Sequence, residues 1–257
     1  MNAWWTRRVP IVFALSLLPL RADVTITEKA SAEAGSSRSE GERVTMIKGS
    51  RMRIESKQGN SATVVIYDGV AKEEITLNAA KRQASIRKFS QIRDAAEKSV
   101  PRENVSASMT PTGRNDAIAG LSCEEQAFTV RVEVFKGGNP TLVLTGRACV
   151  ATNTPGAQEY AAFASAEGKE GLVPGLNSSN PVLVALARAE TAAYELVATR
   201  GGFPLRMERD IRFEGGFFAS LLNKSSGWRK ATVTAVSAEP IPSEDFAIPN
   251  GWKTTGR

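Results

Sequence analysis

The first candidates for chemistry in this sequence are three short motifs built from serine, lysine and asparagine. Residues 85–88 match SxxK, residues 178–180 match SxN, and residues 253–256 loosely resemble KTG. Together such motifs mark serine acyl-transfer enzymes in which a lysine, here Lys88, activates a serine, here Ser85. The KTG-like match carries one residue too many and lies at the end of the chain, and about one SxxK is expected by chance in a chain of this kind. A hydrolase is therefore the weakest of the hypotheses considered.

Two acidic residues form the next candidate site. Glu208 and Asp210 stand two apart in a predicted strand, so they share one face, as glycosidase acids or metal ligands do. Arg206 and Arg212 flank them on that same face. Alternating charges of this kind are typical of a salt-bridged, solvated strand face, which is the reading we favour.

Histidine is absent from the 257 residues, and this excludes several classes of site. A Ser-His-Asp or Cys-His nucleophile, an imidazole base and a histidine-bound metal cannot be built. Two cysteines are too few for a zinc cluster. We therefore expect a protein that is not an enzyme, with no catalytic residue, no metal and no cofactor.

The N-terminus has the pattern of a secretory signal peptide. Arg7 and Arg8 precede an apolar run over residues 9–20, and Leu20-Arg21-Ala22 forms a cleavage site. We predict a signal peptide over 1–22, cleaved after Ala22, and a single domain over 23–257. The chain would then be periplasmic or secreted. The alternative is an uncleaved N-terminal anchor helix, although the apolar run is short for a span; no transmembrane helix is expected in the mature chain.

Cleavage changes the charge of the protein. Without the three signal-peptide arginines, 30 basic residues face 27 acidic ones, and the net charge falls from +6 to +3. Export and this near balance argue against a nucleic-acid partner, in spite of the sequence pI near 9.5. The densest basic stretch, residues 81–98, is interrupted by acidic residues and is read as a solvated face; contact with anionic lipid headgroups is the alternative.

The two cysteines flank a strong turn signal. Cys123 and Cys149 lie on either side of residues 135–140, between two strand-like runs. In an oxidising compartment two cysteines are usually paired, and a hairpin would place them across from or diagonal to each other. We predict a structural disulfide. A catalytic thiol is the poorer alternative, because neither a histidine nor a CxxC motif is present.

The elements that would position any site are mostly strands. Period-two alternation predicts about nine strands in mostly antiparallel order, with turn or loop regions at 35–41 and 99–117. Helical spacing is seen over 89–98, 158–166 and 181–199. The third helix begins at Pro181 after the cap candidate Asn180; its first half is apolar nearly all round, and Arg188, Glu190 and Glu195 are expected to face outward. The α+β pattern predicts a single curved antiparallel sheet with two or three helices on its concave face.

Aromatic residues after the strand at 205–214 allow two readings. Phe213, Phe217 and Phe218 border Gly215 and Gly216. They form either the edge of a core or a mobile apolar lip at the mouth of a cavity.

Three stretches resemble a known family. Residues 45–55 (TMIKGSRMRIE), 120–124 (GLSCE) and 246–253 (FAIPNGWK) are similar, in order and spacing, to motifs of secreted bacterial proteins of a domain of unknown function. That group is similar to the LolA- and LolB-like periplasmic lipoprotein carriers, and the resemblance covers most of residues 23–253. One departure is Ala148-Cys149-Val150, where an aromatic is common. The resemblance implies an unclosed β-barrel plugged by helices, with a cavity for lipoprotein acyl chains and no catalytic residue.

The first functional hypothesis is an exported, non-enzymatic protein that binds an apolar ligand, either a lipid or an acylated protein. The second is a cell-envelope interaction module with a filled core and a protein partner, and the third is the hydrolase. For the first hypothesis, residues 182–186 would act as a plug or lid and inward-facing strand residues would line a cavity, although most of them could equally be plain core. The candidate cavity residues are Met46, Met52, Ile54, Val130, Val132, Val182, Leu183, Leu186, Met207 and Ile211.

Overall fold

The computed structural model describes residues 23–34, 37–135, 137, 139–176 and 178–256. In this part of the chain, twelve strands form one sheet in the order β12-β6-β5-β4-β3-β2-β1-β11-β10-β9-β8-β7. All neighbours are antiparallel except β12, which runs parallel to β6. The strands are β1 (Val24–Ala34), β2 (Ser37–Lys48), β3 (Arg51–Gln58), β4 (Ser61–Asp68), β5 (Glu73–Asn78), β6 (Gln83–Lys88), β7 (Val105–Ile118), β8 (Leu121–Glu133), β9 (Thr141–Ala151), β10 (Phe203–Glu214), β11 (Gly227–Ser237) and β12 (Lys253–Thr255).

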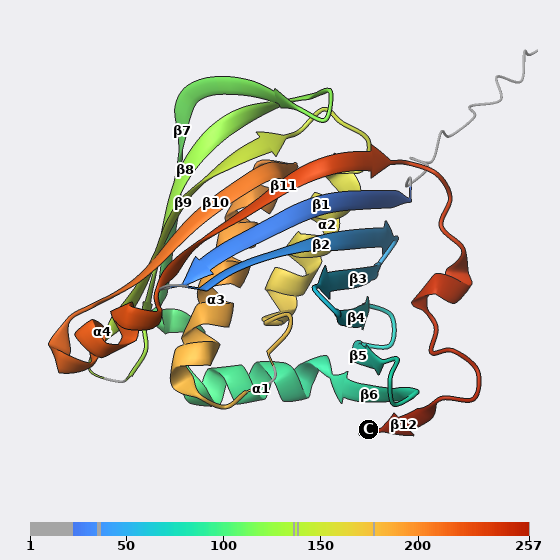
Figure 1. Ribbon diagram of the computed structural model, residues 1–257, viewed down its shortest axis with the longest axis horizontal. Coiled ribbons are helices and arrows are strands. Elements are labelled where there is room, and N and C mark those ends of the chain that lie inside the picture. The colour runs from blue at the N-terminus through green and yellow to red at the C-terminus, as the bar shows by residue number, and fades with distance from the viewer. Residues whose placement is uncertain (1–22, 35–36, 136, 138, 177, 257) are drawn as a thin grey trace, which may run out of the picture.

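Helices cover one side of this sheet. The sheet curves, and α1, α2 and α3 lie within its concave side, whereas α4 lies beyond the end of β10 (Figure 1). The two edge strands, β7 and β12, are not paired with each other, so the barrel is unclosed. The helices are α1 (Phe89–Ser99), α2 (Ala157–Glu170), α3 (Pro181–Ala198) and α4 (Gly216–Leu222), with short 3-10 turns at Arg102–Asn104, Asn223–Ser225 and Ser243–Phe246.

The β2–β3 hairpin shows how a turn decides which side chains face inward. Gly49 adopts φ 58°, which glycine tolerates, and the two-residue turn pairs Lys48 with Arg51. As a consequence Ile47 lies opposite Met52, an odd-numbered residue opposite an even-numbered one. An even-numbered side chain of β2 and an even-numbered side chain of β3 therefore point to opposite faces of the sheet, and the same holds for odd-numbered ones.

The helix that borders the concave face begins where the sequence predicts. The Asn180 side chain accepts a hydrogen bond from the Val182 amide at 2.9 Å, and Pro181 occupies the first turn, where no amide donor is needed. Within α3 the buried residues include Val184, Ala185, Ala189 and Ala193, whose small side chains let the helix approach the sheet.

The predicted class, an α+β fold with one open curved sheet, agrees with the structure, but the number of elements differs. Twelve strands and four α-helices are present in the described residues, against about nine strands and two or three helices expected. The predicted loop at 99–117 is wrong: most of it is the edge strand β7, which is exposed along most of its length. Such a strand needs no apolar alternation, and Pro111 stands at a register irregularity, where a missing amide donor is tolerated.

The turn region predicted at 35–41 is also shorter than expected. From Ser37 onward the chain already belongs to β2, and β1 pairs with β2 as far as Ala34 and Ser37. This polar end of the hairpin is largely exposed, so its sequence carries no burial signal. The predicted signal peptide, residues 1–22, lies outside the described residues.

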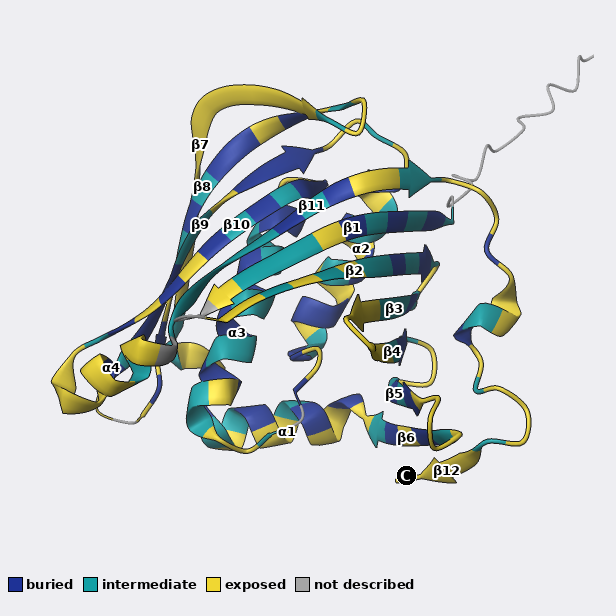
Figure 2. Cartoon of the chain, in the orientation of Figure 1, coloured by how far each residue is buried: buried dark blue, intermediate teal, exposed yellow. Residues whose placement is uncertain are grey.

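Two hydrophobic cores occupy the two faces of the sheet. The larger core fills the space between the concave face and α1–α3, and Figure 2 shows buried residues on the helix sides that face the sheet. A smaller core lies on the convex face, where Ile241 and Phe246 of the C-terminal segment cover Ile66, Ile75 and Ile86. The C-terminal segment thus completes the sheet at the β6 end by covering it and by adding β12.

The predicted disulfide is present. Cys123 of β8 is bonded to Cys149 of β9, and their Cα atoms are 5.3 Å apart. The direct register partner of Cys149 is Glu125, so the two cysteines lie diagonal to each other across the hairpin. No free cysteine remains in the part of the chain that the structure describes.

Candidate functional site

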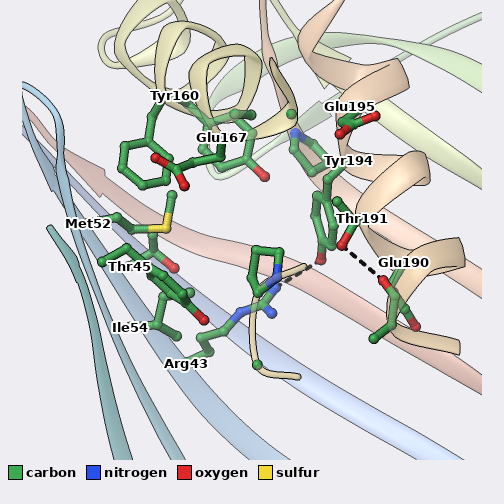
Figure 3. Close-up of a pocket in the computed structure, with 18 of the residues that line it drawn as sticks. Arg43, Thr45, Met52, Ile54, Tyr160, Glu167, Glu190, Thr191, Tyr194 and Glu195 are labelled. Atoms are coloured by element: carbon green, nitrogen blue, oxygen red, sulfur yellow. Dashed lines mark hydrogen bonds between the residues drawn. The ribbon is translucent and has the colours of Figure 1, made fainter. Parts of the chain in front are cut away.

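A cavity of about 490 Å³ lies between the concave face of the sheet and the helices α2 and α3. Strands β1–β4, β10 and β11 contribute its floor, and the connection between α2 and α3 contributes Pro174, Gly175, Leu176 and Ser178. The volume falls within the range of small-molecule sites. Figure 3 shows its lining, with strand residues on one side and helix residues on the other.

One wall of the cavity is apolar. Ile26 of β1 and Met52 and Ile54 of β3 face inward, and Leu183 and Leu186 face them from the first turns of α3. Antiparallel pairing keeps these strand side chains on one face, since Ile54 lies opposite Thr45 and Met52 opposite Tyr67. Phe163 and Phe203 extend the same wall.

A charged cluster lies within this apolar setting. Arg43 donates to both carboxylate oxygens of Glu28, at 2.7 and 3.0 Å, and to the Tyr194 hydroxyl at 3.2 Å. The electrostatic interaction with Tyr194, and a smaller one with Glu28, hold the pKa of Arg43 well above its ordinary value, although burial lowers it. Arg43 therefore remains charged while it joins β2 to β1 and to α3.

A second arginine completes the cluster from β10. Arg209 is only 8% exposed, hydrogen-bonds Glu190 of α3, donates to the Tyr194 hydroxyl at 3.3 Å and lies 5.8 Å from the Tyr194 ring centre. Arg229 of β11 adds an ion pair with Glu190 at 3.6 Å. Tyr194 thus bridges the two arginines, and each arginine has a carboxylate partner.

Glu167 of α2 is the contrasting group in this cavity. It is 6% exposed, and its Oε2 atom has no hydrogen-bond partner. Burial raises the pKa of this carboxyl to about 7. The charge of Lys72 lowers this pKa somewhat, and the charge of Glu170 raises it further. A buried carboxyl without a partner favours its protonated form, so Glu167 titrates near neutral pH.

The connection between α2 and α3 is held against the sheet. The Gly175 amide donates to Glu74 Oε2 at 3.3 Å, and Glu74, 1% exposed, is also hydrogen-bonded by Arg87. Burial, with a further contribution from Glu74, raises the pKa of Tyr67 well above its ordinary value. This buried group of side chains on β4–β6 fixes the loop that borders the cavity.

The candidate cavity residues from the sequence divide into two groups in the structure. Met52, Ile54, Leu183 and Leu186 line the cavity. The others do not line it: Val130, Val132, Met207 and Ile211 belong to the large core, and Val182 packs against that core.

Met46 lies apart from both groups. It packs against the convex core, because the two-residue turn at Gly49 reverses the parity between β2 and β3. The inward residues of β2 are Arg43, Thr45 and Ile47 instead. The expectation that Met46 faces inward is therefore wrong.

The predicted outward face of the third helix is also wrong. Arg188 is 5% exposed, hydrogen-bonds the Val100 carbonyl at 3.2 Å and pairs with Glu97 of α1 at 2.5 Å. Glu190 and Glu195 line the cavity. These charges are tolerated on the inner side because partners on other elements neutralise them, and a single helix pattern cannot show such partners.

The charged cluster and Glu167 are the residues that sequence reasoning missed. One signal was available: Glu190 and Tyr194 stand four apart, hence on one face of α3, together with Leu183 and Leu186. The opposite partners, Glu28, Arg43 and Arg209, come from strands distant in the sequence, and no local pattern joins them.

Residues of the candidate enzymatic motifs form ion pairs on the sheet. Lys88 hydrogen-bonds Glu73 at 2.6 Å. Glu208 pairs with Lys230 at 2.9 Å and lies 3.9 Å from Arg206, as the salt-bridged reading predicts. Among the described residues, no three acidic or cysteine side chains gather into a metal-binding group.

The basic stretch and the aromatic segment lie outside the cavity lining. In the basic stretch, Arg87 pairs with Glu74 and Arg93 with Asp94. Phe213 is buried, whereas Phe217 and Phe218 are 81% and 61% exposed on α4. Neither Phe217 nor Phe218 lines the cavity, which does not support the alternative of a lip at its mouth. No helix in the described ranges combines the length and the apolarity that crossing a bilayer requires.

Comparison with known proteins gives structural neighbours of low sequence identity. No family model and no curated protein matches the sequence. Among solved structures, PNGF-II is 8% identical with a TM-score of 0.39 over 91% of this chain. A chain of the Pseudomonas aeruginosa MucA/MucB complex is 13% identical, with a TM-score of 0.32 over 90% of this chain. A Vibrio parahaemolyticus domain named as an outer membrane lipoprotein-sorting protein domain is 8% identical, with a TM-score of 0.34. The match covers 88% of this chain and 89% of that domain.

The first two neighbours are longer proteins. This chain spans 31% of the PNGF-II chain and 56% of the chain matched in the MucA/MucB complex. The set thus includes a domain of the lipoprotein-sorting type that the sequence motifs resemble, at very low identity. At TM-scores below 0.5, no function is transferred from these neighbours.

Proposed function

We propose that this protein is an exported, non-enzymatic binder of an amphipathic ligand, a lipid or an acylated protein, whose apolar chain occupies the cavity between the sheet and α2–α3. The observation that carries the proposal is the cavity itself, about 490 Å³ with Met52, Ile54, Leu183 and Leu186 in its wall. An apolar space of this size within a close-packed domain is expected to hold a ligand, since cores otherwise close such voids.

The disulfide supports the exported setting of this proposal. Cys123 and Cys149 form a buried bond, 5% and 1% exposed, and such bonds persist in oxidising compartments. Cleavage of residues 1–22 is part of the same proposal. Mass measurement of the protein recovered from a periplasmic extract checks it, because the mature chain would lack these 22 residues.

The ligand is tested first by native mass spectrometry of that same material, followed by organic extraction. A reproducible adduct of lipid mass is the expected result. A clean apo mass under gentle conditions, together with no binding of added aliphatic ligands, would contradict the proposal.

A matched pair of variants on α2 tests the position of the ligand. Ala164 lines the cavity, and Ala162 lies exposed on the same helix. Ala164→Trp places an indole in the cavity and should lower the affinity for the neutral probe N-phenyl-1-naphthylamine by about tenfold or more. Ala162→Trp should leave that affinity unchanged. Equal effects of the two variants would place the binding elsewhere.

One observation favours the second candidate, an envelope interaction module. On α4, Phe217, Phe218 and Leu221 are 81%, 61% and 54% exposed, and the two phenylalanine rings contact each other edge to face. Contiguous exposed apolar side chains of this kind mark interaction sites. A Phe217→Ser/Phe218→Ser variant that loses a co-purifying envelope protein while it keeps its lipid adduct would support this candidate as a separate function.

A further inference from the structure

The cavity contains a polar group that no protein partner satisfies. Glu167 is 6% exposed, and its Oε2 atom lacks a hydrogen bond. Figure 3 shows its carboxyl reaching from α2 toward Tyr160 and Met52, inside the lined space. A buried carboxyl with an open oxygen, aimed into an apolar cavity, is a subsite for a hydrogen-bond donor.

The cations near Glu167 are already engaged. Lys72 donates to Glu170 at 3.0 Å. Arg102 donates to the Gly168 carbonyl at 2.9 Å and lies 3.7 Å from Glu195.

On the other side of the cavity, the arginines have carboxylate partners as well. Arg43 is paired with Glu28 and Arg209 with Glu190. The cavity therefore supplies Glu167 with neither a donor nor a dedicated positive charge among these contacts.

We propose that Glu167 binds the primary ammonium group of an amphipathic ligand whose aliphatic chain fills the cavity. This inference rests on the proposed function and names the ligand class for the same site. An ammonium group supplies both missing contributions, a hydrogen-bond donor for Oε2 and a compensating charge for the desolvated carboxylate.

The same contacts argue against the other head groups. An anionic head would meet an uncompensated carboxylate at Glu167. On the other side of the cavity, Arg209 Nε has no hydrogen-bond partner, but Glu190 already neutralises the charge of that guanidinium, so an anion placed there would lack a charge partner of its own. A neutral hydroxyl would satisfy Oε2 but would leave the carboxylate charge unbalanced at alkaline pH. Of these head groups, only a cationic donor both satisfies the open Oε2 atom and compensates the carboxylate charge of Glu167.

The experiment compares three probes of equal chain length, n-decylammonium, n-decanol and n-decanoate, by calorimetric titration of the full mature chain at about pH 8. Decylammonium should bind at least roughly tenfold more tightly than decanol, and decanoate should bind most weakly. Between about pH 8 and pH 5 the decylammonium affinity should fall, because the probe stays charged while Glu167 becomes protonated.

Two glutamate variants, one at the proposed subsite and one far from it, provide the control. Glu167→Gln should lower the decylammonium affinity by about tenfold or more and leave decanol binding within about threefold, which shows that the cavity is intact. Glu124→Gln removes the same charge at an exposed position on β8, outside the cavity lining, and should change neither affinity by more than about twofold.

The outcomes separate this inference from the function on which it rests. If decanol or decanoate binds as tightly as decylammonium, or if both variants act alike, the ammonium subsite is wrong although the cavity binds aliphatic chains. If none of the three probes binds, both proposals fail. The source of the ammonium group is then distinguished by comparing the affinities for lysophosphatidylethanolamine and lysophosphatidylglycerol. A preference for the ethanolamine lipid indicates a lipid headgroup. Tight binding of decylammonium without such a preference indicates a free amine.

Discussion

Arg43 and Glu28 are direct register partners on β2 and β1, and they form two hydrogen bonds of 2.7 and 3.0 Å inside the cavity lining. The Glu28 side chain is 10% exposed and that of Arg43 is 28% exposed. This bidentate pair sits at the centre of the polar cluster, because Arg43 also donates to Tyr194 on α3. It ties the floor of the cavity to the helix that closes it.

Removal of one member of this pair should destabilise the protein. Arg43→Met leaves the Glu28 carboxylate buried without a partner, and we expect the free energy of unfolding to fall by about 3 kcal/mol. The double variant Glu28→Met/Arg43→Met removes both charges and should recover much of that loss. Urea unfolding followed by circular dichroism measures both effects.

The control for that prediction is an exposed ion pair at the far end of the same hairpin. Arg38 and Glu40 are both more than half exposed, so Arg38→Met should change the stability by less than about 1 kcal/mol. If the double variant is as unstable as Arg43→Met alone, the uncompensated charge is not the cause.

The stability of the protein should depend on pH through Glu167. The pKa of this carboxyl is raised from 4.5 to about 7, so between these values the folded protein holds a proton that the unfolded chain releases. Stability is therefore highest below pH 4.5 for this group and falls as the pH rises toward about 7, by up to about 3 kcal/mol. Glu167→Gln should remove this decline and make the protein more stable than wild type at pH 8.

The measurement is the difference in unfolding free energy between wild type and Glu167→Gln from pH 4 to pH 8. The difference should grow with pH in favour of the variant, whereas the exposed control Glu124→Gln should show no such growth. Parallel curves for wild type and Glu167→Gln would mean that Glu167 ionises normally.

The disulfide should stabilise the folded protein, because it closes a loop and so restricts the unfolded chain. Cys123 and Cys149 are 26 residues apart, and a loop of this length corresponds to about 3.5 kcal/mol in the chain-entropy model. The Cys123→Ala/Cys149→Ala variant should lose about that much stability. Dithiothreitol should destabilise wild type by a similar amount and leave the variant unaffected; equal effects of the reductant on both proteins would contradict the assignment.

Gly146 should be intolerant of any side chain. A Cβ atom at this position would lie 2.0 Å from the Glu208 carbonyl oxygen and 2.7 Å from the Phe128 ring, and Gly146 is the register partner of Arg209. Gly146→Ala must push β9 away from β10 beside the cavity and should cost about 2 kcal/mol or more. Thermal unfolding measures this loss.

The control glycine is Gly49, where an added Cβ meets nothing within 4 Å and only the left-handed backbone resists substitution. Gly49→Asn should cost less than about 1 kcal/mol, since asparagine tolerates that region. If Gly146→Ala is no more harmful than Gly49→Asn, the two strands are free to move apart.

Much of the framework was readable from local patterns. Alternation located most strands, the Asn180–Pro181 start located α3, and the turn signal between Cys123 and Cys149 indicated their pairing. These predictions succeeded because each depends on residues close together in the sequence. The edge strand β7 escaped because an exposed strand needs no apolar face.

Predictions that depend on relative position across the fold were less successful. Met46 was expected inside and lies on the convex face, because the β2–β3 turn, and not the parity of the sequence alone, decides the register. Glu190 was expected to face solvent and lies in the cavity, because Arg209 and Arg229 from other strands neutralise it.

The class of this protein follows from its sequence alone: an α+β chain without histidine chemistry, with two cysteines suited to a disulfide and a helix too apolar to stay outside the core. These properties follow from composition and from the short-range periods of helix and strand. Which atoms of the buried charged groups find a partner depends on the tertiary structure. Arg43 has a partner in Glu28, whereas the Oε2 atom of Glu167 lacks one. That difference depends on strands and helices meeting across the cavity, and local sequence carries no record of the distances between them.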